Sequence, residues 1–433
     1  MKVPSVPVVA DVEMFCKSFR KVLSKPQYAH FYRLVISLLV CLQAHRVTDS
    51  VRLFQYCCHW TNVYKFLRSE AWYYWKVAQE LWNLVIEQIG NPIRVFVVLD
   101  DTTVRHGGAR KMEEVRQHHN ASAQNDPCRP KKVWGHKWVL LGLAVMMDSL
   151  HWEFMPISAF LVEAGVSKLQ LALSFFTQLN IPATIILTVI ADGWYTKRPL
   201  VTGLFSLNMN YLGKVRKDAK LYEPLLQNPS RKRNKRGPRP QKGPRVYLTD
   251  LTKRQPELCM VDVIIRGKKR CVDIWSKIVI VPRWNGMQVK AMVVRWKLKS
   301  GRLKYLNLLC TDLTLPLLDI LKYYDARWMI EPCFCYLKQV GGFASYSGRK
   351  IRGHLAWAHI CCVARTLLVL LNLKSKKGGI IDPWRRRNQP EYPTVGQRRL
   401  ELTSLFSRFA SLEQKAPISG DSETIKCQRT KNR

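Results

Sequence analysis

The sequence predicts an α/β protein in which helices pack against a mixed β-sheet. Three observations lead to this fold class. Residues 1–90 carry apolar side chains at helical spacing. After Asn91 and Pro92 the pattern changes to short β-branched runs that alternate with helical segments. Two of these runs end in aspartate, as buried strands do when their carboxyl ends face solvent.

The first ninety residues are expected to form a helical N-terminal domain. Apolar residues recur at helical spacing from Phe31 to Leu39 and again from Trp72 to Leu84. No helix-turn-helix pattern is present. A plain helical bundle and a DNA-binding domain therefore both remain open for this segment.

Residues 91–218 predict the first part of a core, in which strands and helices follow one another in a fixed order. The strands are expected at Arg94–Asp100, Trp138–Met147, Trp152–Val162, Thr184–Asp192 and Tyr211–Val215, and the helices at Ser167–Leu179 and Lys197–Ser206. The second and third strands are joined by a tight turn at Asp148 and Ser149. Three antiparallel strands followed by strand–helix–strand crossover connections are typical of a ribonuclease-H-like core.

Residues 219–304 are expected to interrupt this core. The segment 229–245 is of low complexity and rich in Lys, Arg, Pro and Gly, which favours an irregular loop. Val261–Leu309 alternates as strands do and has a turn at Ser300 and Gly301, so a β-rich insertion is predicted. Helix resumes near Thr314 and continues with a kink to about Leu371, within a second core part over 305–372. Residues 373–433 predict a basic, turn-rich and poorly ordered tail that includes Arg398 and Arg399.

The charge balance indicates a polyanionic partner. There are 70 Lys and Arg against 31 Asp and Glu, a net charge of +39 at pH 7. Such a field attracts nucleic acid through counterion release. The early apolar run at Leu34–Leu42 is too short to span a membrane, so a cytosolic protein is expected. The 13 cysteines contain no CxxC pair, which favours reduced thiols without a zinc site.

Two acid-ended strands suggest a metal site. The carboxyl ends of neighbouring strands meet at one crevice, which would bring Asp100 or Asp101 close to Asp192. Carboxylate oxygens suit hard divalent cations, and phosphoryl transfer on DNA uses two such ions. Acids at strand ends are also common in solvated turns, so a third carboxylate is needed.

The third carboxylate is expected in the helical segment 324–338. Tyr324, Arg327, Glu331 and Lys338 lie three, seven and fourteen positions apart, which places them within an arc of about 60° on one helix face. A solvated face with an Arg327–Glu331 pair is the simpler interpretation. It does not explain the apolar residues on the other sides of the helix.

This spacing, Tyr-(2)-Arg-(3)-Glu-(6)-Lys, resembles the YREK signature of bacterial cut-and-paste insertion-sequence transposases. The Asp-Asp-Thr-Thr run at 100–103, the Trp-Gly-His-Lys-Trp-Val run at 134–139 and the basic run at 213–218 are also similar to that family. The resemblance covers roughly residues 91–372. It implies a DDE transposase that cleaves transposon ends and transfers them into target DNA, in the cytoplasm and at the nucleoid.

The resemblance also implies roles for individual residues. Asp101, directly before Thr102, resembles the first catalytic aspartate, with Asp100 as the fallback because a one-residue shift reverses the face of a strand. Asp192 and Glu331 complete a triad that holds two Mg²⁺ ions, for which Mn²⁺ can substitute. Tyr324, Arg327 and Lys338 would bind phosphates around the cleaved end.

Further DNA contacts and partners follow from the same resemblance. The loop residues Arg231, Lys232, Arg233, Lys235 and Arg236 are expected to track the phosphate backbone without reading its sequence. Relatives stack a flipped base on an aromatic ring in the insertion, and Trp275, Trp284 and Trp296 are either such platforms or packing residues. Double-stranded DNA is the partner, both as terminal inverted repeats and as target, and a homodimer is expected on it.

Two features qualify these assignments. Pro332 follows Glu331 and removes a helix hydrogen bond, so a kink or a helix restart is expected there, which would move Lys338 off the shared helix face. The histidines at positions 106, 118, 119, 136 and 354 have no zinc-site spacing and are expected to be structural.

Two other functions remain open at this point. The chain could be a transposase-derived protein that now only binds DNA as a repressor, or a nuclease of the same fold that never performs strand transfer. An intact triad argues against the first. Only an assay for joined DNA product separates the second from a transposase.

Overall fold

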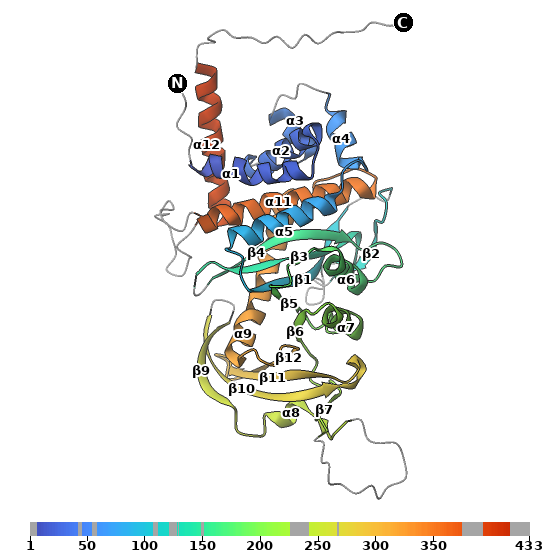
Figure 1. The fold of residues 1–433 in the computed structure, drawn as a ribbon, viewed down its shortest axis with the longest axis vertical. Helices are drawn as coiled ribbons and strands as arrows, with labels where there is room; N and C mark the ends of the chain where they lie inside the picture. The colour runs from blue at the N-terminus through green and yellow to red at the C-terminus, as the bar shows by residue number, and fades with distance from the viewer. Residues whose placement is uncertain are drawn as a thin grey trace, which may run out of the picture.

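The computed structural model describes residues 7–41, 46–53, 59–106, 111–120, 128, 130–148, 151–225, 242–265, 268–374 and 393–415. The described strands join in one mixed sheet of 12 strands, in the order β2-β3-β1-β5-β6-β12-β11-β10-β7-β8, with β4 beside β3 and β9 beside β10. Helices cover one end of this sheet, and the antiparallel strands β9 to β12 lie at the other end (Figure 1). The predicted α/β class is confirmed.

The N-terminal segment is helical, as its apolar periodicity predicts. Its elements are α1 (Pro7–Ser18), η1 (Phe19–Lys21), α2 (Lys25–Val40), α3 (Val47–Leu53), α4 (Thr61–Arg68) and α5 (Tyr74–Gln88). Ser24 and Gln27 form a capping box that starts α2. Helices α1, α2, α4 and α5 all contact α11 (Ile351–Lys374), so they share a core with the later part of the chain. A separate DNA-binding domain here stays a prediction.

The central strands follow the predicted order. They are β1 (Arg94–Arg105), β3 (Lys132–Met146), β4 (Trp152–Leu161), β5 (Ile186–Ala191) and β6 (Asn210–Lys214), with helices α6 (Lys168–Gln178) and α7 (Arg198–Ser206) between them. Strands β1, β3 and β4 pair antiparallel, whereas β1, β5 and β6 pair parallel. The short edge strand β2 (Arg116–His119) was not predicted. Its polar composition carries no strand pattern.

The region predicted as an insertion continues the same sheet. It contains β7 (Leu221–Tyr222), β8 (Arg245–Val246), α8 (Leu248–Leu251), β9 (Leu258–Ile265), β10 (Lys268–Val281), η3 (Pro282–Trp284), β11 (Met287–Lys297) and β12 (Leu303–Cys310). Gly301 adopts a φ of 78° in the turn before β12, a conformation that glycine accepts readily. Strand β12 pairs with β6, so the added strands are bonded to the core, and their status as a distinct domain stays a prediction.

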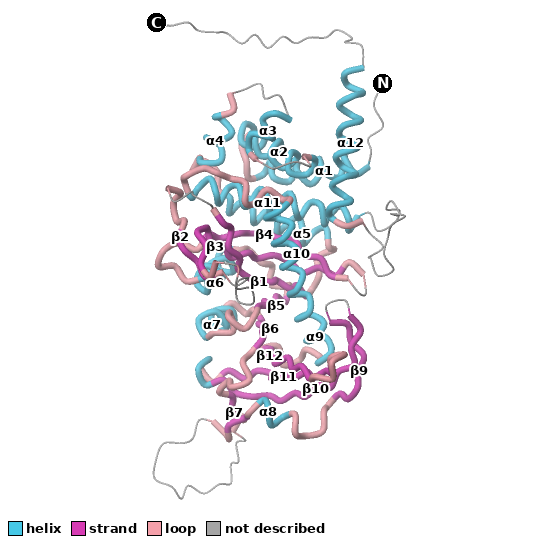
Figure 2. The backbone as a smooth tube through the Cα atoms, turned by 180° about the vertical axis from the view of Figure 1, so that it is seen from behind, coloured by secondary structure: helices cyan, strands magenta, loops and turns pink. Residues whose placement is uncertain are grey.

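The last helices are α9 (Leu317–Ala326), η4 (Arg327–Met329), α10 (Ile330–Gln339), α11 and α12 (Val395–Lys415). Figure 2 shows α9 and α10 running between the β-rich end and the central strands. The turn η4 and the restart at Ile330 place Pro332 in the first turn of α10, where a missing N–H is tolerated. Helix α11 has the length and hydropathy of a membrane span, but its apolar window is entirely buried inside the protein, as in a core helix.

The expected basic tail is corrected in its first part. Arg398 and Arg399 lie in α12 and are only 2% and 1% exposed. Arg398 donates to the Asn372 side chain at 2.9 Å, and Arg399 donates to the backbone oxygens of Val340 and Cys41. A turn-rich, poorly ordered segment was expected, but Arg398 is buried against the side chains of Asn372 and Glu401, and Arg399 binds carbonyls at the ends of two other helices.

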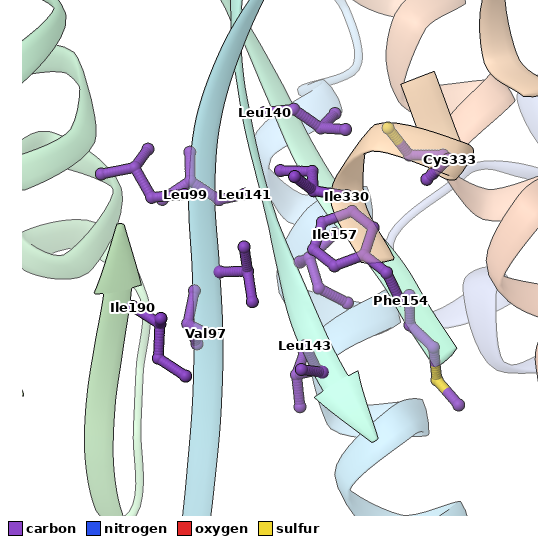
Figure 3. Close-up of a cluster of buried hydrophobic side chains, with 14 of the residues drawn as sticks. Val97, Leu99, Leu140, Leu141, Leu143, Phe154, Ile157, Ile190, Ile330 and Cys333 are labelled. Atoms are coloured by element: carbon purple, nitrogen blue, oxygen red, sulfur yellow. The ribbon is translucent and has the colours of Figure 1, made fainter. Parts of the chain in front are cut away.

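The two faces of the sheet are covered by different helices. Helix α6 contacts β3, whereas α10 contacts β1 and β4. Figure 3 shows Ile330 and Cys333 of α10 beside Leu140 of β3 and Ile157 of β4. Because Asp100 pairs with Leu140 and Asp101 pairs with Val139, the two aspartates lie on opposite faces of β1.

Candidate active site

Asp100 lies beside the signature helix. Its Oδ2 atom is 3.1 Å from Nη1 of Arg327, and Nη2 of the same guanidinium is 3.2 Å from Oε1 of Glu331. Arg327 therefore lies between two carboxylates that are 231 positions apart in the chain. Its side chain is only 12% exposed, so this bridge is largely shielded from water.

Asp192 joins the group through the register of the parallel strands. Leu99 pairs with Ala191, the last residue of β5, so Asp192 directly follows the strand end that lies beside Asp100. The charge of Asp192 acts to raise the pKa of Asp100, and it acts in the same direction on the pKa of Lys168, the partner of Asp101. Asp192 therefore lies close to both sides of the β1 end. The turn after β5 is held by a bond from the Trp194 backbone N–H to Oδ1 of Asp192, at 2.8 Å.

The pKa of Asp100 is raised to about 7. Burial is the main cause, and the carboxylates of Asp192 and Asp101 add to it, while the N–H of Asp101 and the Arg327 guanidinium act in the opposite direction. The single guanidinium of Arg327 therefore does not fully neutralise the negative charge of Asp100, Asp192 and Glu331. These oxygen donors fit a hard divalent cation, which would supply the missing positive charge.

Asp101 has different partners on the other face. Its carboxylate contacts Nζ of Lys168 at 2.5 Å and Nζ of Lys137 at 2.8 Å, and it accepts a bond from Oη of Tyr195 at 3.0 Å. Burial of this carboxyl raises its pKa, but Lys168 and Lys137 outweigh that effect, and the pKa is lowered. The negative charge of Asp101 is therefore already compensated by the protein.

An exposed aromatic ring stands between two cations next to Asp192. Nζ of Lys168 lies 3.6 Å from the ring centre of Trp194, and Nζ of Lys197 lies 3.9 Å from it. None of these three residues was predicted from the sequence to belong to the site. Lys137 lies in the quoted run 134–139, but the two lysines and Trp194 carry no motif that would have selected them.

Of the two remaining signature residues, Tyr324 lies near Arg327, whereas Lys338 has different neighbours. The phenol of Tyr324 lies close enough to Arg327 to affect the pKa of its guanidinium. Lys338 lies near Arg105 and 5.8 Å from the ring of Phe334, and burial lowers its pKa. It makes no ion pair with any residue that the structure describes.

The other predicted DNA contacts divide into two groups. Arg231, Lys232, Arg233, Lys235 and Arg236 lie outside the described residues. Trp275 and Trp284 are 3% and 5% exposed, and Nε1 of Trp275 donates to the backbone oxygen of Arg254 at 2.8 Å. These two rings are packing residues in this structure, the simpler of the two interpretations. Trp296 is partly buried against the same core.

The fold and these carboxylates define a class of protein. Its members have a mixed α/β core with aspartates at the ends of adjacent strands, and a neighbouring helix supplies a third carboxylate. The family model described as "Transposase DDE domain" matches residues 91–367, well over half of the chain. The chain therefore belongs to the DDE transposase family. A search of curated proteins finds no match.

Membership of this family establishes the general activity. The chain is a transposase whose substrate is DNA, and the family generally uses divalent metal ions. The matched range contains both strand-end aspartates and the signature helix, and it also contains the β-rich region between them.

Proposed function

We propose that this transposase cleaves DNA at transposon ends and joins them to target DNA, with two divalent ions held by Asp100, Asp192 and Glu331. The observation that supports this proposal most is the Arg327 bridge, because it brings Asp100 and Glu331 together beside the strand end that Asp192 follows. Sequence similarity favoured Asp101 as the first acid. The geometry favours Asp100 instead, since Asp101 is already paired with two lysines.

The proposed ions are Mg²⁺, with Mn²⁺ as a substitute. Bound between the three carboxylates, they would activate the attacking oxygen and stabilise the leaving oxygen. Ion binding requires Asp100 to release its proton and Arg327 to turn away from the carboxylates. The freed guanidinium would then bind a phosphate of the cleaved strand through its fork, with Tyr324 beside it.

The proposed reaction proceeds by successive displacements at phosphorus. Water attacks a phosphodiester at the transposon end and releases a 3′-hydroxyl and a 5′-phosphate. That hydroxyl attacks the opposite strand and forms a hairpin, which is reopened and joined to target DNA. The role of Asp101 would be to hold Lys168 and Lys137 at the edge of the site, where Lys168 and Lys197 flank Trp194 and can approach the phosphate backbone.

The proposed partners are double-stranded DNA, as terminal inverted repeats and as target, and a second copy of the chain. A homodimer is proposed because two transposon ends must be held together. The excess of positive charge supports binding along the DNA backbone, with the nucleoid as the site of action in the cytoplasm.

The deciding experiment uses a supercoiled plasmid that carries the element's own terminal repeats, with Mg²⁺ or Mn²⁺. Wild type is expected to excise the segment and to join pre-cleaved ends to a second plasmid. Glu331→Gln and Asp100→Asn should lose both products and still bind the ends in a gel-shift assay. The matched control is Asp319→Asn, which removes a carboxylate from the first turn of α9 and should keep activity.

Other outcomes separate the competing functions. End binding without cleavage by wild type would favour a DNA-binding repressor. Cleavage without joined product would favour a nuclease. Full activity of Asp100→Asn, together with loss of metal binding in Asp101→Asn, would return the first catalytic position to Asp101.

A further inference from the structure

Three histidines from distant parts of the chain meet at one place. His106 follows β1, His136 lies within β3 and His354 lies in the first turns of α11. Their candidate ligand nitrogens all lie within 4.8 Å of one another. The imidazoles are deeply placed, with exposed fractions of 9%, 0% and 4% respectively.

Two of the rings are oriented by backbone carbonyls. Nε2 of His136 lies 2.8 Å from the oxygen of Glu113, and Nε2 of His354 lies 2.6 Å from the oxygen of Gly348. A ring nitrogen at that distance from a carbonyl carries the proton, so the lone pair is on Nδ1 of each ring. Histidines that bind metals are commonly held in this way, with the second nitrogen donating to a carbonyl.

Two imidazole nitrogens of this cluster lack partners among the described residues. Nδ1 of His136 and Nε2 of His106 are buried and have no hydrogen-bond partner. A buried polar atom without a partner costs about 1–3 kcal/mol, so two of them at one position call for an explanation. Burial and the neighbouring imidazoles lower the pKa of His106 to about 4 and that of His354 to about 3. Burial also lowers the pKa of His136, so all three rings are neutral near pH 7, the form that binds metals.

We propose that His106, His136 and His354 form a binding site for one Zn²⁺-type transition-metal ion, separate from the carboxylate site. Three neutral imidazoles suit a borderline-soft ion and not Mg²⁺, which takes oxygen ligands. In a tetrahedral zinc site the nitrogens lie about 3.4 Å apart, so the rings would close by roughly 1 Å. A water molecule completes the fourth position.

The ion would join the paired strands β1 and β3 to helix α11. It would tie the end of β1 and the strand β3 to the start of α11, directly after the loop that follows α10. Tyr346 of that loop already packs edge-on against His354, with ring centres 4.8 Å apart. The ion therefore has a structural role, and it should raise the melting temperature of the whole chain.

The test uses the purified full-length protein. After removal of metals with a chelator and addition of Zn²⁺, the wild type should retain one zinc ion per chain through desalting, measured by mass spectrometry. His136→Gln and His354→Gln should bind zinc at least roughly tenfold more weakly. His119→Ala, which changes an exposed histidine of the neighbouring strand β2, should bind as the wild type does.

Two further measurements keep the proposal decidable. Asp192→Asn should retain zinc, because it changes only the carboxylate site, and loss of zinc in that variant would overturn the assignment. If the histidine variants fail to fold, Co²⁺ is added to the metal-free wild type, where visible absorption bands that Zn²⁺ abolishes are expected. A folded wild type that shows neither these bands nor a zinc-dependent rise in melting temperature would overturn the proposal. None of these readouts depends on DNA cleavage.

Discussion

Asp100 and Asp101 are adjacent in the chain and differ in almost every physical respect. The carboxyl of Asp100 is buried near Asp192 with one guanidinium to balance it, and its pKa is raised to about 7. The carboxyl of Asp101 has two ammonium groups and a phenol as partners, and its pKa is lowered. The alternation of side chains along a strand is the cause, since it turns the two residues to different faces.

These pKa shifts predict opposite effects of substitution on stability in metal-free buffer at pH 8. The native state holds a proton on Asp100 up to about pH 7, whereas the unfolded chain releases it near 3.9, so ionised Asp100 destabilises the fold as pH rises. Asp100→Asn should then stabilise the fold by up to about 4 kcal/mol at pH 8, because the pKa difference is about three units. Asp101→Asn should destabilise by about 2–3 kcal/mol, because it leaves two ammonium groups without their partner.

Urea unfolding at pH 5 and pH 8 measures whether each substitution raises or lowers the free energy of unfolding. The increase in the free energy of unfolding that Asp100→Asn gives over wild type should be smaller at pH 5. At that pH Asp100 is already protonated in most folded wild-type molecules. The loss of stability in Asp101→Asn should persist at pH 5, since the lowered pKa of Asp101 keeps the wild-type carboxylate ionised at that pH. Equal destabilisation by both variants at pH 8 would contradict the assignment of the two environments.

The signature helix is built from two helical pieces with a tight turn between them. Arg327 lies in η4 and Glu331 in the first turn of α10, which starts at Ile330. Pro332 falls where the helix has no use for a backbone N–H, so its ring is accommodated and the helix continues to Gln339. The restart still brings Arg327 within reach of Glu331, whereas Lys338 lies toward Arg105.

The position of Pro332 within α10 predicts a contrast between two substitutions. Pro332→Ala should change the free energy of unfolding by less than about 1 kcal/mol, because no hydrogen bond is regained in the first turn. Cys335→Pro, at an exposed position in the interior of the same helix, should destabilise by about 3 kcal/mol. Thermal unfolding followed by circular dichroism measures both. A large loss in Pro332→Ala would mean that the helix depends on the proline to start at Ile330.

At the scale of the whole molecule, α12 ties the N-terminal helices to the signature segment. Arg399 donates to the carbonyl of Val340 at the end of α10 and to that of Cys41 at the end of α2. Carbonyls at helix ends lack partners within their own helices, and a guanidinium can satisfy several of them at once. Burial lowers the pKa of Arg399, consistent with a structural side chain and not a solvated one.

Arg399→Met is therefore expected to lower stability by about 1–3 kcal/mol, because two helix-end carbonyls lose their donor. Its DNA affinity should keep the wild-type salt dependence, since a side chain that is only 1% exposed cannot reach a phosphate. Arg216→Met, the matched control, removes the same charge from a highly exposed side chain and should change stability by less than about 0.5 kcal/mol. Unfolding and salt-titrated DNA binding are measured on both variants. A reduced salt slope with unchanged stability in Arg399→Met would contradict the structural role.

The order of the core elements could be predicted from the sequence because local patterns encode them. Apolar runs ending at Asp100 and Asp192 marked two parallel strands, and polar spacing marked the helix of Glu331. The spacing of Tyr324, Arg327 and Glu331 is a property of one helical segment and needs no distant partner. The edge strand β2 and the buried arginines of α12 could not be predicted, because their residues are polar and their partners lie far away in the chain.

The sequence by itself thus determined the fold class, the family and the presence of three carboxylates at the ends of strands and a helix. Only the tertiary structure decided which face of β1 meets the signature helix, and so which aspartate lies beside Arg327. The meeting of His106, His136 and His354 was decided in the same way. Periodicity along a chain reports that side chains alternate, whereas the face they meet depends on the register with neighbouring strands and on the helices that cover them.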